Sequence, residues 1–240
     1  MEKKLVIDII IPAYNPGGSL RDAINSCLSQ TYKNYKITVI DDCSTEDVES
    51  LVNDFENINY LRNNKNLGPG ASRNIGIRNT SGDLISMLDA DDIMHKNKLE
   101  LSIKEFEKNK DIGMTCGNYR ILVNRKRLMA PFYKMPIKIG HRELMRQNYV
   151  ASGSVTMKRS VIEDVGLFDE KYWIAEDYDM WLRISEKYPI SYIHDILYYY
   201  SVLPGGSSLT QRSDIQKKHM DNIAKIKKAS QDRILKNKND

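Results

Sequence analysis

Three carboxylates within four residues, those of Asp89, Asp91 and Asp92, directly follow a short apolar run at residues 84–88. A run of this length predicts a buried strand, and open α/β sheets bind their ligands at the carboxyl ends of such strands. Carboxylates this close raise one another's pKa unless a cation lies among them. Hard oxygen ligands suit Mg²⁺ or Mn²⁺, which usually share their coordination with substrate phosphates. The alternative is an acidic turn that caps the next helix, because Asp is a favoured N-cap residue.

A second acidic group opens the predicted helix that starts at Glu176 and continues through Asp177 and Asp179. A carboxylate whose pKa is raised by burial and by like-charged neighbours works well as a general base, which favours Asp177 for that role. Trp181 would supply a low-dielectric wall, and taken alone it indicates packing in the core or beside an acceptor. The alternative for Glu176 and Asp177 is a pair of first-turn acids that interact with the helix dipole.

Groups suited to phosphate lie between these two acidic clusters. The loop at residues 68–73 opens a helix, whose N-terminal amides favour an anion, and Arg73 can bind a phosphate through two parallel hydrogen bonds. Acids for a metal, donors for phosphate and a Tyr for stacking together suit a nucleoside diphosphate. A dinucleotide-binding fold is the competing interpretation, but the Gly-rich fingerprint after the first strand is missing.

Composition sets the class of protein. The chain has 240 residues and is 41% hydrophobic, enough for one large α/β domain or two small ones. Cys27, Cys43 and Cys116 lack metal-type spacing, so we expect reduced thiols and a cytoplasmic setting, with no signal peptide. The net charge is +4, but residues 211–240 hold nine Lys or Arg against four Asp. The nearly neutral body argues against a nucleic-acid partner.

The elements that must position these groups alternate along the first half of the chain. We predict strands at 5–11 (closed by Pro12), 35–40, 58–61 and 84–88, and helices after an N-cap at Ser19, over 48–55, from Pro69 and over 97–109. Such alternation predicts a parallel, doubly wound sheet. The polar loops 12–18, 41–45 and 89–92 would then converge on one cleft.

The second half is less regular. We predict strands at 112–119, 120–128, 153–157, 190–193 and 196–202, helices over 160–165 and from Glu176, and a long terminal helix capped by Ser213 or Asp214. Ile215, Ile223, Ile226 and Ile234 fall near helical spacing with Lys between them. This pattern suits an amphipathic helix on an anionic membrane, or a helix packed on the body with a solvated end.

Six motifs, taken together, resemble glycosyltransferase family 2 enzymes over roughly residues 5–205. The motifs are Pro12-Ala13-Tyr14-Asn15, residues 41–45, residues 66–74, residues 88–92, residues 166–170 and residues 176–183. The resemblance implies an inverting enzyme with the GT-A fold, of the type that acts in bacterial surface-glycan assembly. In that fold a Rossmann-like, mostly parallel central sheet is flanked by helices and joined to a small acceptor-side subregion.

The resemblance also implies a role for each matching residue. Ala13 and Tyr14 would line the nucleoside pocket, with the Tyr14 ring near the base, and Asp42 would accept from the imide of uracil or thymine. Pro12 and Asn15 would also bind the nucleotide sugar. Asn66, Gly68 and Arg73 would lie by the nucleotide sugar, with Arg73 at the diphosphate. Asp89 and Ala90 would lie near the ribose, and Asp91 with Asp89 would hold Mn²⁺ or Mg²⁺. Asp177 would be the general base, with Glu176 beside it.

The chain departs from the family after its Tyr-rich strand. Many members carry Arg and then His where Ser201 and Leu203 stand here, which leaves the third protein ligand of the metal open. His194 and His219 are candidate substitutes, although a lone His is more often a structural residue. Ser207 and Ser208 could still meet the diphosphate if their loop closes over it.

We therefore predict a metal-dependent, inverting transfer of a sugar from a nucleotide-diphosphate sugar, with a UDP-sugar as the favoured donor, to a glycan or lipid-linked hydroxyl. The predicted organisation is a glycosyltransferase domain over 1–210, with a nucleotide-binding half to about 118 and an acceptor-binding half from about 119, and a basic helix or tail over 211–240. Peripheral contact with the inner face of the cytoplasmic membrane and a homodimer are left open. The competing hypotheses are a sugar nucleotidyltransferase and a non-catalytic sugar-nucleotide-binding module.

Overall fold

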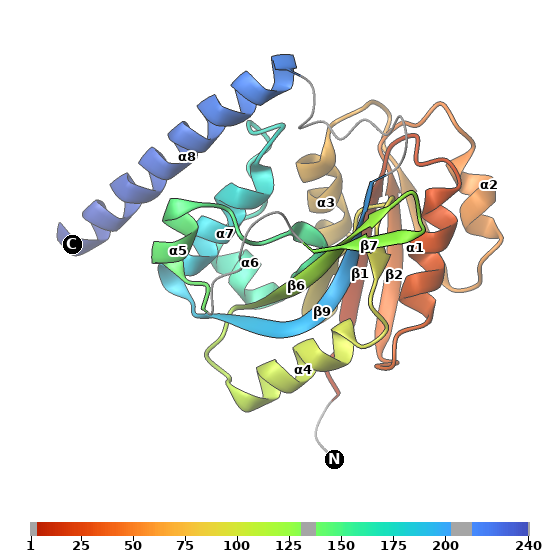
Figure 1. The fold of residues 1–240 in the computed structure, drawn as a ribbon, viewed down its shortest axis with the longest axis horizontal. Coiled ribbons are helices and arrows are strands. Elements are labelled where there is room, and N and C mark those ends of the chain that lie inside the picture. The colour runs from red at the N-terminus through yellow and green to blue at the C-terminus, as the bar shows by residue number, and fades with distance from the viewer. Residues whose placement is uncertain (1–3, 131–137, 203–212, 240) are drawn as a thin grey trace.

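A mixed sheet of nine strands organises the protein, for which the computed structural model describes residues 4–130, 138–202 and 213–239 (Figure 1). The strand order is β3-β2-β1-β4-β8-β6-β9-β5, with β7 paired to β6. The strands are β1 (Ile7–Ala13), β2 (Tyr35–Asp41), β3 (Ile58–Arg62), β4 (Leu84–Met87), β5 (Ile93–Met94), β6 (Met114–Val123), β7 (Arg127–Met129), β8 (Thr156–Lys158) and β9 (Ile190–Val202). The α/β class predicted from the sequence is confirmed.

Helices lie on both faces of the sheet (Figure 1). They are α1 (Ser19–Leu28), α2 (Val48–Asn53), α3 (Pro69–Arg78), α4 (Lys98–Lys108), α5 (His141–Arg146), α6 (Arg159–Val165), α7 (Glu176–Lys187) and α8 (Ser213–Asn239), with a short 3-10 helix η1 (Ser152–Ser154). Strands β3, β2, β1 and β4 are parallel, as their alternation with helices predicts. Beyond β4 the sheet is mixed, because β8 runs antiparallel to both β4 and β6, while β6 and β9 are parallel.

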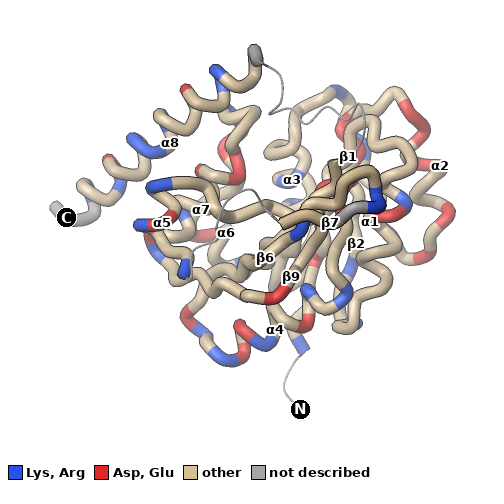
Figure 2. The backbone as a smooth tube through the Cα atoms, viewed as in Figure 1, with Lys and Arg blue, Asp and Glu red and all other residues tan. Residues whose placement is uncertain are grey.

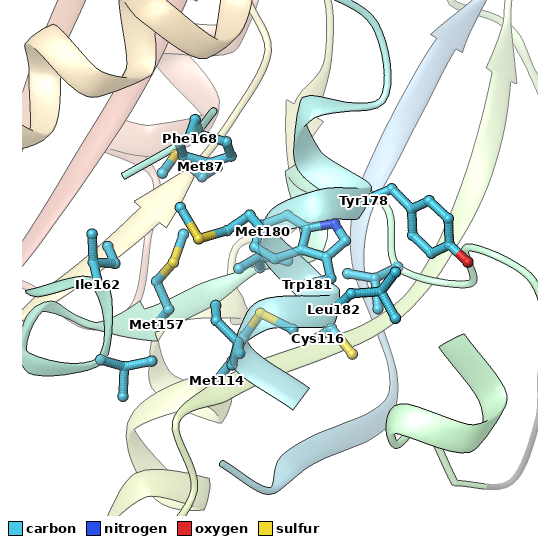
Figure 3. Packing of buried hydrophobic residues seen from close by; sticks show 14 of the residues in the cluster. Met87, Met114, Cys116, Met157, Ile162, Phe168, Tyr178, Met180, Trp181 and Leu182 are labelled. Atoms are coloured by element: carbon cyan, nitrogen blue, oxygen red, sulfur yellow. The ribbon is translucent and has the colours of Figure 1, made fainter. Parts of the chain in front are cut away.

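Alternate residues of β1 feed two hydrophobic clusters, one on each face of the sheet. Ile7, Ile9 and Ile11 pack with side chains of α1, α2 and α4, whereas Ile10 packs with those of α3, α6 and α7. Figure 3 shows the second cluster, in which Trp181 lies among Met and aromatic side chains. Trp181 is fully buried, so its predicted place in the core is confirmed.

Two sequence predictions at the start of the chain were wrong by one or two residues. Strand β1 does not close at Pro12 but continues to Ala13, because its pairing with β4 ends at Ile10 and a Pro in that stretch interrupts no ladder on the β4 side. Helix α1 has Gly18 as its N-cap; Ser19 is its first residue and donates its hydroxyl to the carbonyl of Pro16 (2.5 Å).

The second half departs further from prediction. Strand β6 runs unbroken through residue 123, and the turn to β7 falls at Asn124 and Arg125, which adopt positive φ angles of 49° and 56°. Strand β9 is also continuous, because its pairing with β6 absorbs residues 194–195 and then Leu197 through register shifts on either side of Asn118. Residues 153–157 are not one strand but η1 followed by β8.

The terminal helix α8 packs on the body, as the second interpretation of its sequence predicts. Ile226 is fully buried against the cluster around Trp181, Asn222 donates to the carbonyl of Ile174 (3.0 Å), and Ser230 and Arg233 both contact Glu186. Most of its Lys residues are exposed, and Figure 2 marks their places along the helix. Among the described residues no helix is both long and apolar enough to cross a membrane. The division of the body near residue 118 stays a prediction.

Candidate functional site

The loops after β1 and β2 are joined to each other at the carboxyl edge of the parallel strands. The Asp42 N–H donates to the carbonyl of Ala13 (2.8 Å), and the Asn15 side chain accepts from the N–H of Thr45 (2.8 Å). Pro12 and Ala13 are buried at the end of β1, whereas Tyr14 is 53% exposed and has its ring free for contact with a ligand.

Asp42 fastens a third loop to the same edge. Its Oδ1 accepts from Asn63 Nδ2 (2.7 Å) and from the N–H of Leu67 (2.9 Å), and its Oδ2 accepts from the N–H of Gly68 (2.8 Å). A carboxylate offers about four acceptor sites, so these three bonds leave room for one further donor. Asn66, predicted to bind the nucleotide sugar, is exposed in the same loop.

Arg73 lies on α3 and ties the two acidic clusters together. Its Nη2 donates to Asp89 Oδ1 (2.7 Å), and its Nη1 donates to Glu176 Oε1 (2.6 Å), with the Arg73 side chain only 4% exposed. Gly70 allows this approach, because a Cβ there would lie 3.0 Å from Cγ of Glu176. The arginine predicted to face a diphosphate therefore meets two carboxylates here, and its buried Nε has no partner in the described part of the chain.

The turn after β4 presents its acids unequally. Asp92 is buried and accepts from the N–H of Ser201 (2.8 Å), so Ser201 meets this cluster through its backbone. Asp91 lies at the surface, and across the described ranges no other residue donates a hydrogen bond to it. Partial loss of water around its carboxyl, followed by the charge of Asp89, raises the pKa of Asp91 to about 6. Ala90 between them is buried.

This donor set fits Mg²⁺ or Mn²⁺ in its chemistry, because Asp89 and Asp91 are oxygen ligands whose mutual repulsion a cation would relieve. It is not a complete protein cage. Among the described residues no three His, Cys, Asp or Glu side chains are grouped for a metal. His194 is exposed with its ring against Tyr192, and His219 lies on α8. Leu203, Ser207 and Ser208 lie outside the described residues.

Glu176 and Asp177 begin α7 after Ala175, which adopts a left-handed φ of 69°. Asp177 Oδ2 accepts from the hydroxyl of Ser152 (2.9 Å), and Oδ1 accepts from the N–H of Tyr178 (2.6 Å). Burial raises the pKa of Asp177 despite the opposing charge of Arg73. Burial likewise raises the pKa of Glu176 to about 7, with Arg73 opposing the shift and Asp177 adding to it.

The structure brings most of the predicted site residues to one side of the molecule and adds three that the sequence analysis missed. Asn63 holds Asp42, Ser152 holds Asp177, and Lys98 is fully buried beneath the site with its Nζ on the carbonyls of Met87 and Gly153. Only Lys98 left a signal in the sequence, since helical spacing places it on the same face of α4 as the apolar residue Phe106.

Comparisons with known proteins agree on one family. Residues 8–166 match the family model described as "Glycosyl transferase family 2". The chain is 32% identical over 191 residues to the Escherichia coli UDP-Glc:alpha-D-GlcNAc-diphosphoundecaprenol beta-1,3-glucosyltransferase WfgD, covering 79% of this chain and 73% of that protein. It spans 62% of the length of two other curated relatives, uncharacterized glycosyltransferases of Rickettsia typhi and Rickettsia prowazekii that are 31% identical to it.

Two solved structures resemble the chain in fold. S. aureus TarS residues 1–349, in complex with UDP-GlcNAc, superposes with a TM-score of 0.71 at 20% identity, over 84% of this chain and 60% of that one. The mannosyltransferase PcManGT from Pyrobaculum calidifontis, in complex with GDP-Man and Mn²⁺, gives a TM-score of 0.66 at 17% identity, over 82% of this chain and 57% of that one.

Proposed function

Because the chain belongs to glycosyltransferase family 2 and has the GT-A fold, we propose that it transfers a hexosyl or N-acetylhexosaminyl group, with inversion, to an acceptor hydroxyl. A UDP-sugar is the proposed donor and a glycan or lipid-linked sugar the proposed acceptor. The name of WfgD, which includes both UDP-Glc and a diphosphoundecaprenol-linked acceptor, and the TarS complex with UDP-GlcNAc support this choice.

One observation carries the proposal: Arg73 joins Asp89, on the proposed donor side, to Glu176, which directly precedes the proposed base. An ion-paired bridge of this kind keeps the two acidic clusters together although they lie 87 residues apart in the chain. A donor held at Asp89 and an acceptor beside Asp177 would therefore meet across one short span, as an in-line displacement requires.

On the donor side, the exposed Tyr14 ring would stack on the nucleobase, and the remaining acceptor site of Asp42 would take its imide N–H. The Gly68 loop would lie against the nucleotide, with Asn66 at its exposed part. Asp91, together with Asp89, would hold Mn²⁺ or Mg²⁺. When bound, the cation would stabilise negative charge on the departing diphosphate as a Lewis acid.

On the acceptor side, Asp177 would take the proton of the attacking hydroxyl. The acceptor oxygen forms its bond to the anomeric carbon from the face opposite the diphosphate, the bond from that carbon to the diphosphate oxygen breaks, and UDP leaves with the electron pair. Burial supports this role by raising the pKa of Asp177, so that the carboxylate gains basicity. Glu176 would act through its ion pair with Arg73 rather than by proton transfer.

The test is release of UDP from UDP-glucose and UDP-GlcNAc, with GDP-mannose for comparison, in the presence of a GlcNAc-diphospholipid analogue. We expect acceptor-dependent release with Mn²⁺ that EDTA abolishes. Asp177→Asn should keep donor affinity by calorimetry and lose transfer. Pyrophosphate formation from a sugar phosphate and UTP would instead indicate a nucleotidyltransferase, and donor binding without turnover a non-catalytic module. Full activity of Asp177→Asn would remove the proposed base.

Helix α8 supports a second proposal, peripheral contact with an anionic membrane surface. Its buried side is used by Asn222, Ile226 and Ser230, and its exposed residues include Lys217, Lys218, Lys225, Lys228, Lys236, Met220 and Leu235. Each Lys near an anionic surface contributes about 1 kcal/mol of attraction. A lipid-linked acceptor would place the enzyme at the inner face of the cytoplasmic membrane.

Sedimentation with vesicles tests this contact. We expect binding to phosphatidylglycerol vesicles at low salt and weak binding to phosphatidylcholine vesicles. Binding to phosphatidylglycerol should be lost in about 0.5 M NaCl, because salt screens the attraction between the Lys side chains and the lipid headgroups. Replacement of Lys217, Lys218, Lys225, Lys228 and Lys236 by Gln should remove the difference. Binding of this variant to phosphatidylglycerol vesicles as strong as that of the wild type would contradict the proposal. A homodimer stays a prediction.

A further inference from the structure

Lys98 is a buried cation that the proposed reaction leaves without a task. It is the first residue of α4 and fully buried, and its Nζ donates to the carbonyl of Met87 (2.9 Å) and to that of Gly153 (2.7 Å). Burial lowers the pKa of Lys98 to about 7. A buried ammonium is costly unless its donors are satisfied, so the two carbonyls it holds indicate a defined structural use.

These two carbonyls belong to the two sides of the site. Met87 ends β4 two residues before Asp89, whereas Gly153 lies in η1 directly after Ser152. Gly153 also packs closely against Tyr198, because a Cβ there would lie 2.6 Å from the Tyr198 ring. The η1 turn is therefore held by Lys98 and packed against Tyr198, at a defined place relative to the end of β4.

The η1 turn reaches the proposed base through one hydroxyl. Ser152 Oγ donates to Asp177 Oδ2 (2.9 Å), while Asp177 Oδ1 is held by the N–H of Tyr178 in its own helix. Within the residues that the structure describes, Ser152 is thus the contact that sets the carboxyl plane of Asp177 from outside α7. The hydroxyl also favours the ionised carboxylate, since it donates to it.

We propose that Ser152 is a positioning residue for the transfer reaction, and that Lys98 holds the η1 turn so that Asp177 keeps a fixed place relative to the carboxylates after β4. This inference rests on the proposed function, because it assigns Ser152 a role that acts through Asp177. The contacts that run from Met87 through Lys98, Gly153 and Ser152 to Asp177 link one side of the site to the other.

The test compares Ser152→Ala with Ser154→Ala, a matched control. Ser154 lies in the same turn, but its hydroxyl donates to the carbonyl of Ala151 (2.8 Å) and not to Asp177. We expect Ser152→Ala to lower kcat for acceptor-dependent UDP release by about tenfold to a hundredfold, with an unchanged KM for the UDP-sugar. Ser154→Ala should stay within about twofold of the wild type, and Ser152→Thr should recover most of the rate because it restores the hydroxyl.

The pH profile gives a readout that a merely structural role would not move. Loss of the Ser152 hydrogen bond raises the pKa of Asp177, so the acid limb of kcat should shift to higher pH in Ser152→Ala but not in Ser154→Ala. The other charged groups that act on Asp177 are Glu176 on its own helix, Arg73 on α3 and Asp89 after β4, and both variants leave them in place.

A double mutant separates this inference from the proposed function. In an Asp177→Asn background, Ser152→Ala should cost nothing further, because the group it orients is already gone. An unchanged kcat in Ser152→Ala, or an equal loss in the Asp177→Asn background, overturns the positioning role while the proposed function stands. Full activity of Asp177→Asn alone removes Asp177 as the base and the positioning role with it, whereas absence of transfer by the wild type overturns the proposed function itself.

Lys98→Met tests the hydrogen bonds by which Lys98 holds the η1 turn. Met has a similar length but cannot donate to the carbonyls of Met87 and Gly153. We expect a lower Tm and a kcat loss of about tenfold or more, although the Ser152 hydroxyl is still present in this variant. If Lys98→Met does not fold, the Ser152 variants decide the matter. A folded Lys98→Met enzyme with wild-type kcat would show that Lys98 is not needed to position Asp177.

Discussion

The acidic turn after β2 and the acidic turn after β4 lie at the same edge of the sheet, yet the chain treats their charges in opposite ways. Asp41 accepts from the N–H of Ser44 (2.9 Å), the hydroxyl of Tyr60 (2.9 Å) and Arg62. Burial alone would raise the pKa of Asp41, but the hydrogen bonds from Ser44 and Tyr60 and the charge of Arg62 outweigh it and lower the pKa. After β4, by contrast, the pKa of Asp91 is raised to about 6.

This difference separates acids that hold the fold from acids kept for a ligand. In the first turn the carboxylates accept hydrogen bonds from the backbone and side chains of the protein itself. Asp42 accepts three of them and so fixes a loop that carries proposed nucleotide contacts. The second turn keeps Asp91 at the surface, where no other described residue donates a hydrogen bond to it, while its neighbour Asp89 is paired with Arg73. Charge left unsatisfied in this way favours function over stability. Substitutions in the two turns should therefore have opposite consequences.

The largest effect is expected from Asp91→Asn. Transfer activity should fall by about a thousandfold or more, because the cation loses a charged ligand. Stability should move the other way: removal of one of two repelling carboxylates should leave the Tm of the metal-free protein equal to or above that of the wild type. Thermal unfolding with and without Mn²⁺ checks both points, since the variant should also lose the Mn²⁺-dependent rise in Tm.

Asp195→Asn, an exposed acid on β9, serves as the control for Asp91→Asn and should retain both activity and the response to Mn²⁺. A clear drop in the Tm of metal-free Asp91→Asn would contradict the comparison, because it would mean that Asp91 holds the fold as Asp41 and Asp42 do.

Asp42→Asn should be the strongest destabilising change of the first turn. Asn turns one acceptor oxygen into an NH₂ group that faces a backbone N–H, so we expect a loss of about 2–3 kcal/mol in the free energy of unfolding. Urea denaturation measures it. Asp47→Asn is a suitable control, because Asp47 caps α2 through Ser50 (3.0 Å) and Asn is an equally good N-cap. Equal stability of Asp42→Asn and wild type would show that the loop does not depend on this carboxylate.

A smaller effect is expected at Gly68, whose N–H contacts Asp42. Gly68 has φ of 88°, and a Cβ there would lie 3.0 Å from the ring of Trp173, which is 39% exposed. Gly68→Ala should cost about 1–3 kcal/mol, because residues other than Gly rarely adopt its backbone conformation (φ 88°, ψ 168°), with a further cost from displacing the ring. Gly17→Ala separates the two terms, since Gly17 has φ of 55° and nothing within 4 Å of such a Cβ. Equal losses of stability would mean that the Trp173 contact contributes nothing.

The first turn and its strands were predictable from the sequence because they depend on local periodicity. Apolar runs separated by helical patterns predict that β1, β2, β3 and β4 are parallel, and the acids at the strand ends then fall on one edge. The continuity of β6 and β9 was not predictable in this way. Each strand contains polar residues that end an apolar run, and only pairing between two distant segments carries the strands across them.

The candidate site divides in the same manner. Asp42, Asp91 and Asp177 could be named from motifs and from the strand-end rule, but their partners could not. Ser152 meets Asp177 from 25 residues away, and Arg73 meets Glu176 from 103 residues away. Contacts of this range depend on how β8 and η1 are inserted beside β4, which no spacing in the chain reveals.

The pH dependence of stability gives the finest test of the comparison. The folded-state pKa of Asp91 is about 6, above the usual Asp value of 3.8, so its unfavourable contribution is fully present above pH 6 and is lost as the pH falls below it. Without metal, the Tm of the wild type should therefore rise relative to that of Asp91→Asn as the pH falls from 7.5 to about 5. Because the carboxyl is open to solvent, screening limits the difference to about 1 kcal/mol, or about 2–4 °C. The other titrating groups, Glu176 among them, are common to both proteins and largely cancel, and saturating Mn²⁺ should reverse the trend. A constant difference in Tm across this range would place Asp91 among the satisfied acids.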